Sequence, residues 1–459
     1  MSLSTEQILA LAPDSSSAKA GSELAKVTSW SELGCTPSAL WGFCKGSGKN
    51  PYKTQIDLSE PAFKCSCPSR KFPCKHGLAL YLVYAENAAL FDPATPPDWV
   101  ETWLDSRQQR AEKRHETQEA KQEALLSLTP EERAKKDKSQ QKRQEKRESL
   151  VNGGVELIEL WLNDIAREGI NTLKNKPLKE WNELAARMVD AQATGLGARI
   201  KKMSSLVHDT NKNDWEMQIA TELAKLSLLT QSYRTIQNLD IDLQADIRSE
   251  IGWTIQQEDV CKGEAILDQW YVLAHYKQQE DKLTTRYTYL YGQKTNRLGL
   301  LLHFAAGNQP LPVAMTVGSY RQGTAYFYPS ATPLRVVFNT DPDVDNPIES
   351  SNSLELSSTI KQDIPIILDS YANILAKNPF IDEYPFLLRY VMVVSHANKW
   401  MIVSPDGVYA LRMTPTFKNK WMLLGITGGQ PVDIFGLWNG ESFTPLSVQT
   451  HGSNYNLEG

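Results

Sequence analysis

The sequence predicts a multidomain α+β protein with an N-terminal unit of strands and a helix, a charged helical linker, a helical bundle and a β-rich C-terminal domain. Length gives the first reason, because 459 residues suffice for two to four domains. Periodicity gives the second, since apolar residues follow helical spacing from about residue 150 to 260 and alternate with period two after Asp268. The third is the segment 106–149, which holds 13 Lys or Arg and 9 Asp or Glu residues and contains no Phe, Trp or Tyr.

We expect the first domain to cover residues 1–105 and to begin with two short helices within 1–34, the first ended by Pro13. Three strands follow, and then a helix that is apolar on nearly every side and is therefore expected to pack against the sheet. The strands and the helix are predicted over 39–44, 52–58, 62–67 and 76–91, in that order.

The mixed charges of 106–149 are typical of a solvated helix, so we interpret this segment as a charged helical linker, with a polyelectrolyte contact as the alternative. A helical bundle is predicted over 150–262, where Val151, Val155 and Ile158 begin a broad apolar face. Its further helices are expected over 178–208, 214–238 and 241–256.

The last domain, 263–459, is predicted to be β-rich with one inserted helical region over about 356–376. Its strands are expected over 270–274, 298–304, 311–317, 334–338, 400–403, 408–411, 421–426 and 431–438. We find no internal repeat of 20–50 residues.

Composition limits the class of protein. Hydrophobic residues make up 41% of the chain, which is enough to form buried cores, and the net charge of −5 argues against a surface that wraps nucleic acid. No run approaches 18 apolar residues, and the N-terminus lacks the features of a secretory signal. Six cysteines are too few for a disulfide scaffold. We therefore expect a soluble cytoplasmic protein without membrane contact.

One cluster of residues carries a specific chemistry. Cys65, Cys67, Cys74 and His76 form a Cys-x-Cys pair and a Cys-x-His pair separated by six residues. Zinc prefers four tetrahedral ligands of this kind, and reducing conditions keep the thiols free to bind it. Because all four positions would be filled by protein, we predict one structural Zn²⁺ rather than a catalytic metal.

The alternative is that these thiols are merely buried as small hydrophobic groups. Three lysines argue against a simple apolar core, since Lys64, Lys71 and Lys75 lie among the cysteines. The Gly46-Ser47-Gly48-Lys49 run is interpreted as a hairpin turn, because it lacks the residues that a phosphate loop requires. Neither paired carboxylates nor a nucleophile motif is evident, so we expect no catalytic residues and no enzyme activity.

The cluster and its surroundings resemble the SWIM-type zinc finger of long bacterial proteins. The residues that carry this resemblance are Trp41-Gly42, Gly46-Ser47-Gly48, Pro51-Tyr52 and 61–77, with weaker blocks at 159–164, 186–192 and 327–329. The resemblance implies a ββα-like finger over about 52–91 that binds DNA or other proteins. It also implies partners, because long bacterial members are typically encoded beside MoxR-type AAA+ ATPases and von Willebrand factor A proteins, which suggests a chaperone-like assembly.

Two functions remain open. From Trp41 to Gly77 the net charge is +5, or about +4 with three thiolates and one Zn²⁺, so a basic surface is available for DNA or RNA. Phe63 and Phe72 are expected to belong to the core rather than to stack on bases. We favour a protein-interaction module or adaptor, with nucleic-acid binding as the alternative. The candidate contact residues for either function are Lys45, Lys49, Lys64, Arg70, Lys71 and Lys75.

Overall fold

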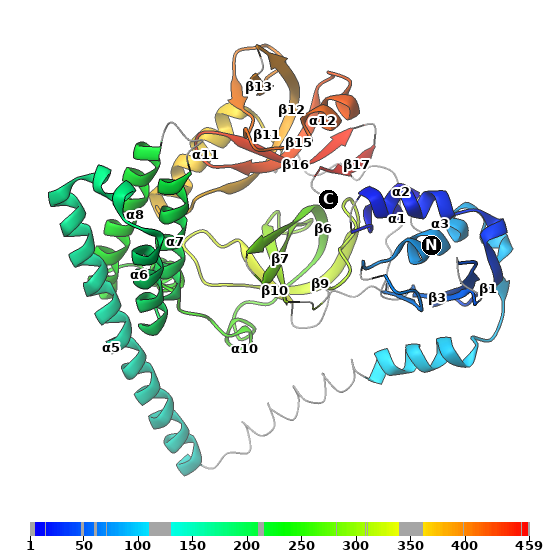
Figure 1. The fold of residues 1–459 in the computed structure, drawn as a ribbon, viewed down its shortest axis with the longest axis horizontal. Helices are drawn as coiled ribbons and strands as arrows, with labels where there is room; N and C mark the ends of the chain where they lie inside the picture. Colours follow the sequence, from blue (N-terminus) through cyan, green and yellow to red (C-terminus); the bar gives the residue numbers. More distant parts are fainter. Residues whose placement is uncertain are drawn as a thin grey trace.

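The chain folds into four parts, and Figure 1 shows a β-barrel lying between an N-terminal α/β unit, coloured blue, and a helical bundle, coloured green. A C-terminal sheet, orange to red, lies against a third side of the barrel, above it in this view. This arrangement confirms the multidomain α+β class. The computed structural model describes residues 5–13, 15–46, 50–58, 62–69, 71–109, 130–209, 215–280, 282–307, 309, 311–338, 361–397, 399–450 and 452–457.

The N-terminal unit packs one helix, α3 (Lys75–Glu86), against a sheet of order β4-β3-β2-β1-β5. Leu40, Ile56, Phe63, Leu78 and Leu82 are buried between them. The other elements are α1 (Thr5–Ala10), α2 (Ser15–Leu24), η1 (Val27–Ser29), β1 (Trp30–Cys35), β2 (Ala39–Cys44), β3 (Tyr52–Asp57), β4 (Ala62–Cys65), η2 (Ala88–Leu90) and β5 (Asp92–Pro93).

The predicted strands and the buried helix of this unit are present, but the sequence did not reveal β1, which lies partly within the region assigned to helices. The Ser-Glu-Leu-Gly segment within it has few residues that favour strands. Tertiary pairing with β2 makes it a strand, and the register shifts between Ser31 and Gly34. Local propensity was therefore overridden by the neighbouring strand.

Two helices cross the boundaries that we placed at either end of the charged linker. A helix over 98–109 extends past residue 105, and α5 (Pro130–Glu168) continues through residue 149 without a break. Arg147 binds the far end of the bundle, since its Nη2 donates to the carbonyl of Gly252 at 3.0 Å and its guanidinium lies 4.2 Å from the Trp253 ring centroid. The bundle's first helix thus begins within the segment assigned to the linker.

The helices after α5 surround a core that includes Trp181, Met188, Ile200, Leu226 and Ile247. They are η3 (Ile170–Asn175), α6 (Leu178–Asp190), α7 (Thr194–His208), α8 (Trp215–Arg234), η4 (Ile236–Asn238), α9 (Ile241–Ile251) and α10 (Gln257–Val260). The single helix predicted over 178–208 is wrong. The chain turns between α6 and α7 because Gln192 adopts φ 56°, which a continuing helix does not allow.

The barrel is closed in the order β10-β8-β7-β6-β9, and its interior is filled by Trp270, Val272, Leu290 and Val336. Its strands are β6 (Ile266–Glu280), β7 (Leu283–Gly292), β8 (Leu298–Ala306), β9 (Tyr320–Phe327) and β10 (Arg335–Phe338). The strand predicted over 311–317 is absent from the described part of that segment, where Pro312 has no N–H to contribute to a ladder.

The C-terminal sheet has the order β14-β13-β12-β15-β16-β17, with β11 pairing with β12. Its elements are β11 (Lys361–Gln362), α11 (Ile364–Lys377), β12 (Tyr384–His396), β13 (Lys399–Val403), β14 (Ala410–Arg412), α12 (Lys420–Thr427), β15 (Val432–Trp438), β16 (Phe443–Thr450) and β17 (Ser453–Asn456). The strand predicted over 421–426 is wrong: this run is α12, which buries Leu423 and Thr427, four residues apart, and exposes Trp421. The helical region predicted to start at 356 begins at Ile364, and 356–360 lie outside the described residues.

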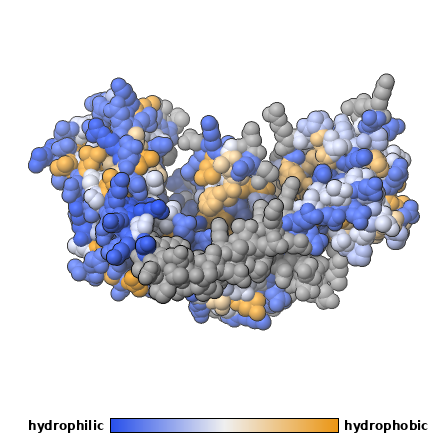
Figure 2. All heavy atoms as spheres, turned by 90° about the horizontal axis from the view of Figure 1, so that it is seen from below, coloured by the Kyte–Doolittle hydropathy of each residue, from blue (hydrophilic) through white to orange (hydrophobic). Residues whose placement is uncertain are grey.

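The parts are joined by buried contacts. Tyr289 on the outer face of the barrel packs against Phe435 and Leu437 of the C-terminal sheet. Phe380, which follows α11, inserts into the core of the bundle. Figure 2 shows hydrophobic side chains in the centre of the molecule, between outer parts whose surfaces are mainly hydrophilic. Among the helices described, none is both long and apolar enough to cross a bilayer.

Candidate metal centre

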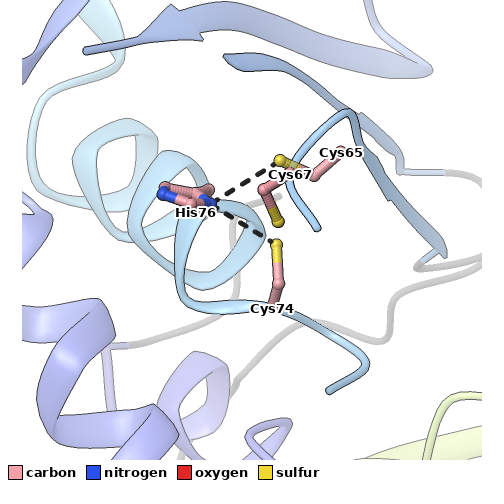
Figure 3. Close-up of side chains that lie close together, drawn as sticks. All are labelled: Cys65, Cys67, Cys74 and His76. Carbon is pink, nitrogen blue, oxygen red and sulfur yellow. Dashed lines mark hydrogen bonds between the residues drawn. The ribbon is translucent and has the colours of Figure 1, made fainter. Parts of the chain in front are cut away.

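The four predicted ligands come together where the β3–β4 hairpin meets the start of α3. Cys65 is the last residue of β4, Cys67 follows it, Cys74 precedes the first turn of α3, and His76 lies within that turn. Figure 3 shows the three sulfur atoms and the imidazole of His76 directed toward one common point. The helix and the hairpin thus each contribute one pair of side chains.

The distances fit a tetrahedral metal. The ligand atoms of all four residues lie within 4.8 Å of one another, and Nδ1 of His76 is 3.7 Å from Sγ of Cys65 and 3.9 Å from Sγ of Cys74. A tetrahedron with Zn–S bonds of about 2.3 Å and a Zn–N bond of about 2.1 Å has S···N edges of roughly 3.6 Å. Three sulfurs and one imidazole nitrogen also match the donors of structural zinc sites.

The site is partly shielded from water. Cys74 and His76 are buried, and Cys65 and Cys67 are half-buried. A hydrogen bond from Cys74 lowers the pKa of Cys65, whereas that same contact and burial raise the pKa of Cys74 to about 12. Burial also raises the pKa of Cys67. The protein alone therefore does not favour three thiolates at this point, and a divalent cation would supply the missing positive charge.

Neighbouring residues to which the sequence analysis assigned no role hold the ligands in place. Thr54 lies opposite Cys65 in the β3–β4 ladder, and its Oγ1 is 3.3 Å from Sγ of Cys65. The Tyr52 ring lies 4.9 Å from the His76 ring, centroid to centroid. Gly77 permits close packing of α3, since a Cβ atom there would lie 2.9 Å from Cδ1 of Phe63. The strand register is the signal that would have pointed to Thr54.

The six basic residues proposed as contacts do not all gather at one place. Lys45, Lys71 and Lys75 line one surface pocket of about 550 Å³, together with Cys67 and His76. Lys64 is exposed on β4 and does not line this pocket. Lys49 and Arg70 lie outside the described residues. Three lysines beside the metal ligands thus form the basic part of this surface.

The expectation that both aromatic residues of the finger belong to the core is wrong for one of them. Phe63 is buried, but Phe72 is 42% exposed. It lies in the loop that leads to Cys74, where the chain runs over the surface before α3 begins. The Phe72 ring still makes an edge contact with Phe63, with 6.4 Å between the centroids.

Comparison with known families agrees with this geometry. A model of the SWIM zinc finger matches residues 52–85, and a model of the SWIM-associated four-helix bundle domain matches residues 146–251. These matches confirm the SWIM-type resemblance and the zinc-finger character of the Cys₃His cluster. No curated protein and no solved structure matches the chain significantly. The bundle match begins at residue 146, before the predicted boundary at 150, in accord with the continuous helix α5.

Proposed function

We propose that this chain is a non-enzymatic, zinc-stabilised interaction module that serves as an adaptor in the cytoplasm. In this proposal Cys65, Cys67, Cys74 and His76 hold one Zn²⁺. The observation that carries the proposal is the closed donor set, because four protein ligands within 4.8 Å of one another leave no coordination position for water or substrate. A reducing compartment would keep the three thiols available.

Bound zinc would supply a cross-link between the β3–β4 hairpin and α3. The protein's own residues then determine which surface the finger presents to a partner. Thr54 and Tyr52 orient Cys65 and His76 from β3, and the buried face of α3 fixes the helix on the sheet. The loop between the two ligand pairs, with Lys71 and Phe72, remains on the surface. This arrangement suits a rigid platform for a partner.

As partners we propose a MoxR-type AAA+ ATPase and a von Willebrand factor A protein, on the resemblance given above. The test uses the full chain, with purified candidates added and complex formation measured by analytical ultracentrifugation. Complex formation by the wild-type chain is the expected result. A Cys67→Ser variant reports whether the finger contributes, and Cys261→Ser, which lies outside the cluster, is the matched control. Absence of a complex with either candidate at high micromolar concentration would reject this assembly.

Nucleic-acid binding is the second candidate, and the convergence of Lys45, Lys71 and Lys75 on one pocket favours it. Such a small patch would contact few phosphates, so the slope of log affinity against log salt should be no steeper than about −4. Fluorescence anisotropy with labelled DNA and RNA measures this slope. Replacing Lys71 and Lys75 by Gln should flatten it while zinc content stays unchanged. A steep slope that survives both changes would locate binding elsewhere.

A further inference from the structure

A cavity of about 580 Å³ lies where the N-terminal unit, the barrel and the C-terminal sheet meet. The N-terminal unit contributes Leu11 and Phe72, the barrel contributes His275 and Arg286, and the C-terminal sheet contributes Asn456. Volumes between about 300 and 1,000 Å³ are typical of small-molecule sites, and such sites often lie between domains. The cavity is separate from the pocket beside the metal ligands, and the proposed function does not use it.

The barrel wall of this cavity carries a row of basic side chains. In the strand register, Lys277 of β6 lies opposite Arg286 of β7, and Arg286 lies opposite His303 of β8. His275 occupies the next position of β6 on the same face, opposite Thr288. Side chains directly opposite one another on adjacent strands are about 4.5–5.5 Å apart at Cβ, and like charges placed so are destabilising. Burial lowers the pKa of His275 to about 4, so its imidazole is neutral at pH 7, and the cations that line the cavity here are Lys277 and Arg286. An anion in the cavity would balance their charge.

Arg286 is the residue that most requires such a balance. It is only 5% exposed, and its Nη1 donates to the carbonyl of Pro312, a neutral acceptor. Its Nε has no hydrogen-bond partner, and no ion pair joins Arg286 to a carboxylate in the described part of the chain. An uncompensated buried charge carries a free-energy cost in general. Consistent with this cost, burial lowers the pKa of Arg286 to about 10.

The remaining lining indicates the shape of the anion. Val313, Val317 and Leu11 give the cavity apolar walls, whereas Asn454 and Thr316 add polar groups near the basic row. Asn456 is already engaged, because its side chain bonds both the N–H and the carbonyl of His275 and so fixes β17 to β6. A guanidinium fork recognises carboxylate or phosphate oxygens, and apolar walls favour a hydrocarbon or aromatic body.

We propose that this cavity binds a small organic anion, a carboxylate or phosphate ester with an apolar body, whose charged group pairs with Arg286. The site joins three parts of the chain, so the ligand would also hold those parts together. The proposal does not rest on the adaptor role.

The test measures ligand binding to the zinc-loaded full chain by isothermal titration calorimetry. The probes are octanoate, octyl phosphate and, as the neutral comparison, octanol; inorganic phosphate alone shows whether the apolar body matters. Binding of octanoate or octyl phosphate, with octanol much weaker, is expected. Arg286→Gln should weaken binding of the anionic probes by about tenfold to a hundredfold, because a charged hydrogen bond is lost. Arg335→Gln, an exposed arginine of the same barrel, should leave it unchanged.

Either of two outcomes overturns the proposal: none of the probes binds, or Arg335→Gln weakens binding as much as Arg286→Gln does. If Arg286→Gln does not fold, as judged by circular dichroism, Ala314→Trp replaces it. This variant fills the cavity while retaining Arg286, and it should abolish binding of octanoate. Undiminished binding by Ala314→Trp would also contradict the site.

Discussion

Truncating Phe380 is expected to destabilise the helical bundle, although this residue belongs to the chain that follows α11. Its ring is 3% exposed and forms part of the same core as Trp181, Ile200 and Leu226. The backbone holds it there, since the N–H of Phe380 donates to Oδ1 of the buried Asn378 at 3.0 Å. Removal of a fully buried phenylalanine side chain costs about 3–5 kcal/mol. Since every 1.4 kcal/mol is a factor of ten, Phe380→Ala should raise the opening equilibrium of the bundle by about a hundredfold to a few thousandfold.

Hydrogen exchange measured by mass spectrometry checks this value, because a chain of several parts does not unfold in one step. Peptides from α7 and α8 should lose protection by that factor, whereas peptides from α3 should not change. Phe304→Ala is the matched control, because this phenylalanine is 53% exposed on β8. Protection of α7 and α8 that falls no more in Phe380→Ala than in Phe304→Ala would refute the idea that this ring completes the bundle core.

Three further predictions follow from other contacts. The purified wild-type chain should contain one zinc ion, measured by atomic emission. Cys74→Ser should lose most of this zinc, whereas the control Cys261→Ser should retain it. Full zinc retention in Cys74→Ser would contradict the ligand set. Burial alone would raise the pKa of Asp382, but hydrogen bonds from Lys225 and Lys202 outweigh burial and lower this pKa to about 2. These ion pairs should therefore stabilise the bundle contact above about pH 4 and lose that effect as the pH falls through 2. Because Asp382 is half-exposed, Asp382→Asn should cost at most about 1 kcal/mol in denaturant titrations at pH 6, and nothing below pH 2. Limited proteolysis should cut first within 106–149. A fragment that starts at residue 130 should melt at a higher temperature than one that starts at residue 150, because only the longer fragment retains the contact of Arg147 with Trp253. Equal melting temperatures would show that this contact does not stabilise the bundle.

The metal cluster was predictable because its chemistry is local in sequence. All four ligands fall within twelve residues, so their spacing alone indicates the donor set. The buried helix after them was also evident, since α3 is apolar on nearly every side. By contrast, the ion pairs of Asp382 with Lys202 and Lys225 join residues that are more than 150 positions apart in the sequence. No periodicity or motif in a single sequence carries information about such a pairing.

The wrong elements share a different cause, which is that short apolar runs do not distinguish strands from helices. The run from Trp421 to Ile426 was interpreted as a strand, but it is α12, whose buried positions are spaced as on a helix. The break between α6 and α7 was missed because Ala191, Gln192 and Ala193 carry no Gly or Pro signal. In each of these cases tertiary packing determines the local conformation.

The two proposed sites share one segment of chain, so they are not physically independent. Phe72 and Pro73 line the cavity that contains Arg286, and the next residue is Cys74, a proposed zinc ligand. Val313, from the barrel's loop, packs against the N-terminal core that includes Phe63 and Leu78. An anion that fixes the cavity wall would therefore also restrict the loop that carries Cys74. Linkage is reciprocal, so any increase in zinc affinity caused by the anion must equal the increase in anion affinity caused by zinc. The bundle lines neither site through the described residues, so its stability is expected to respond to neither zinc nor the anion, whereas the barrel wall should respond to both.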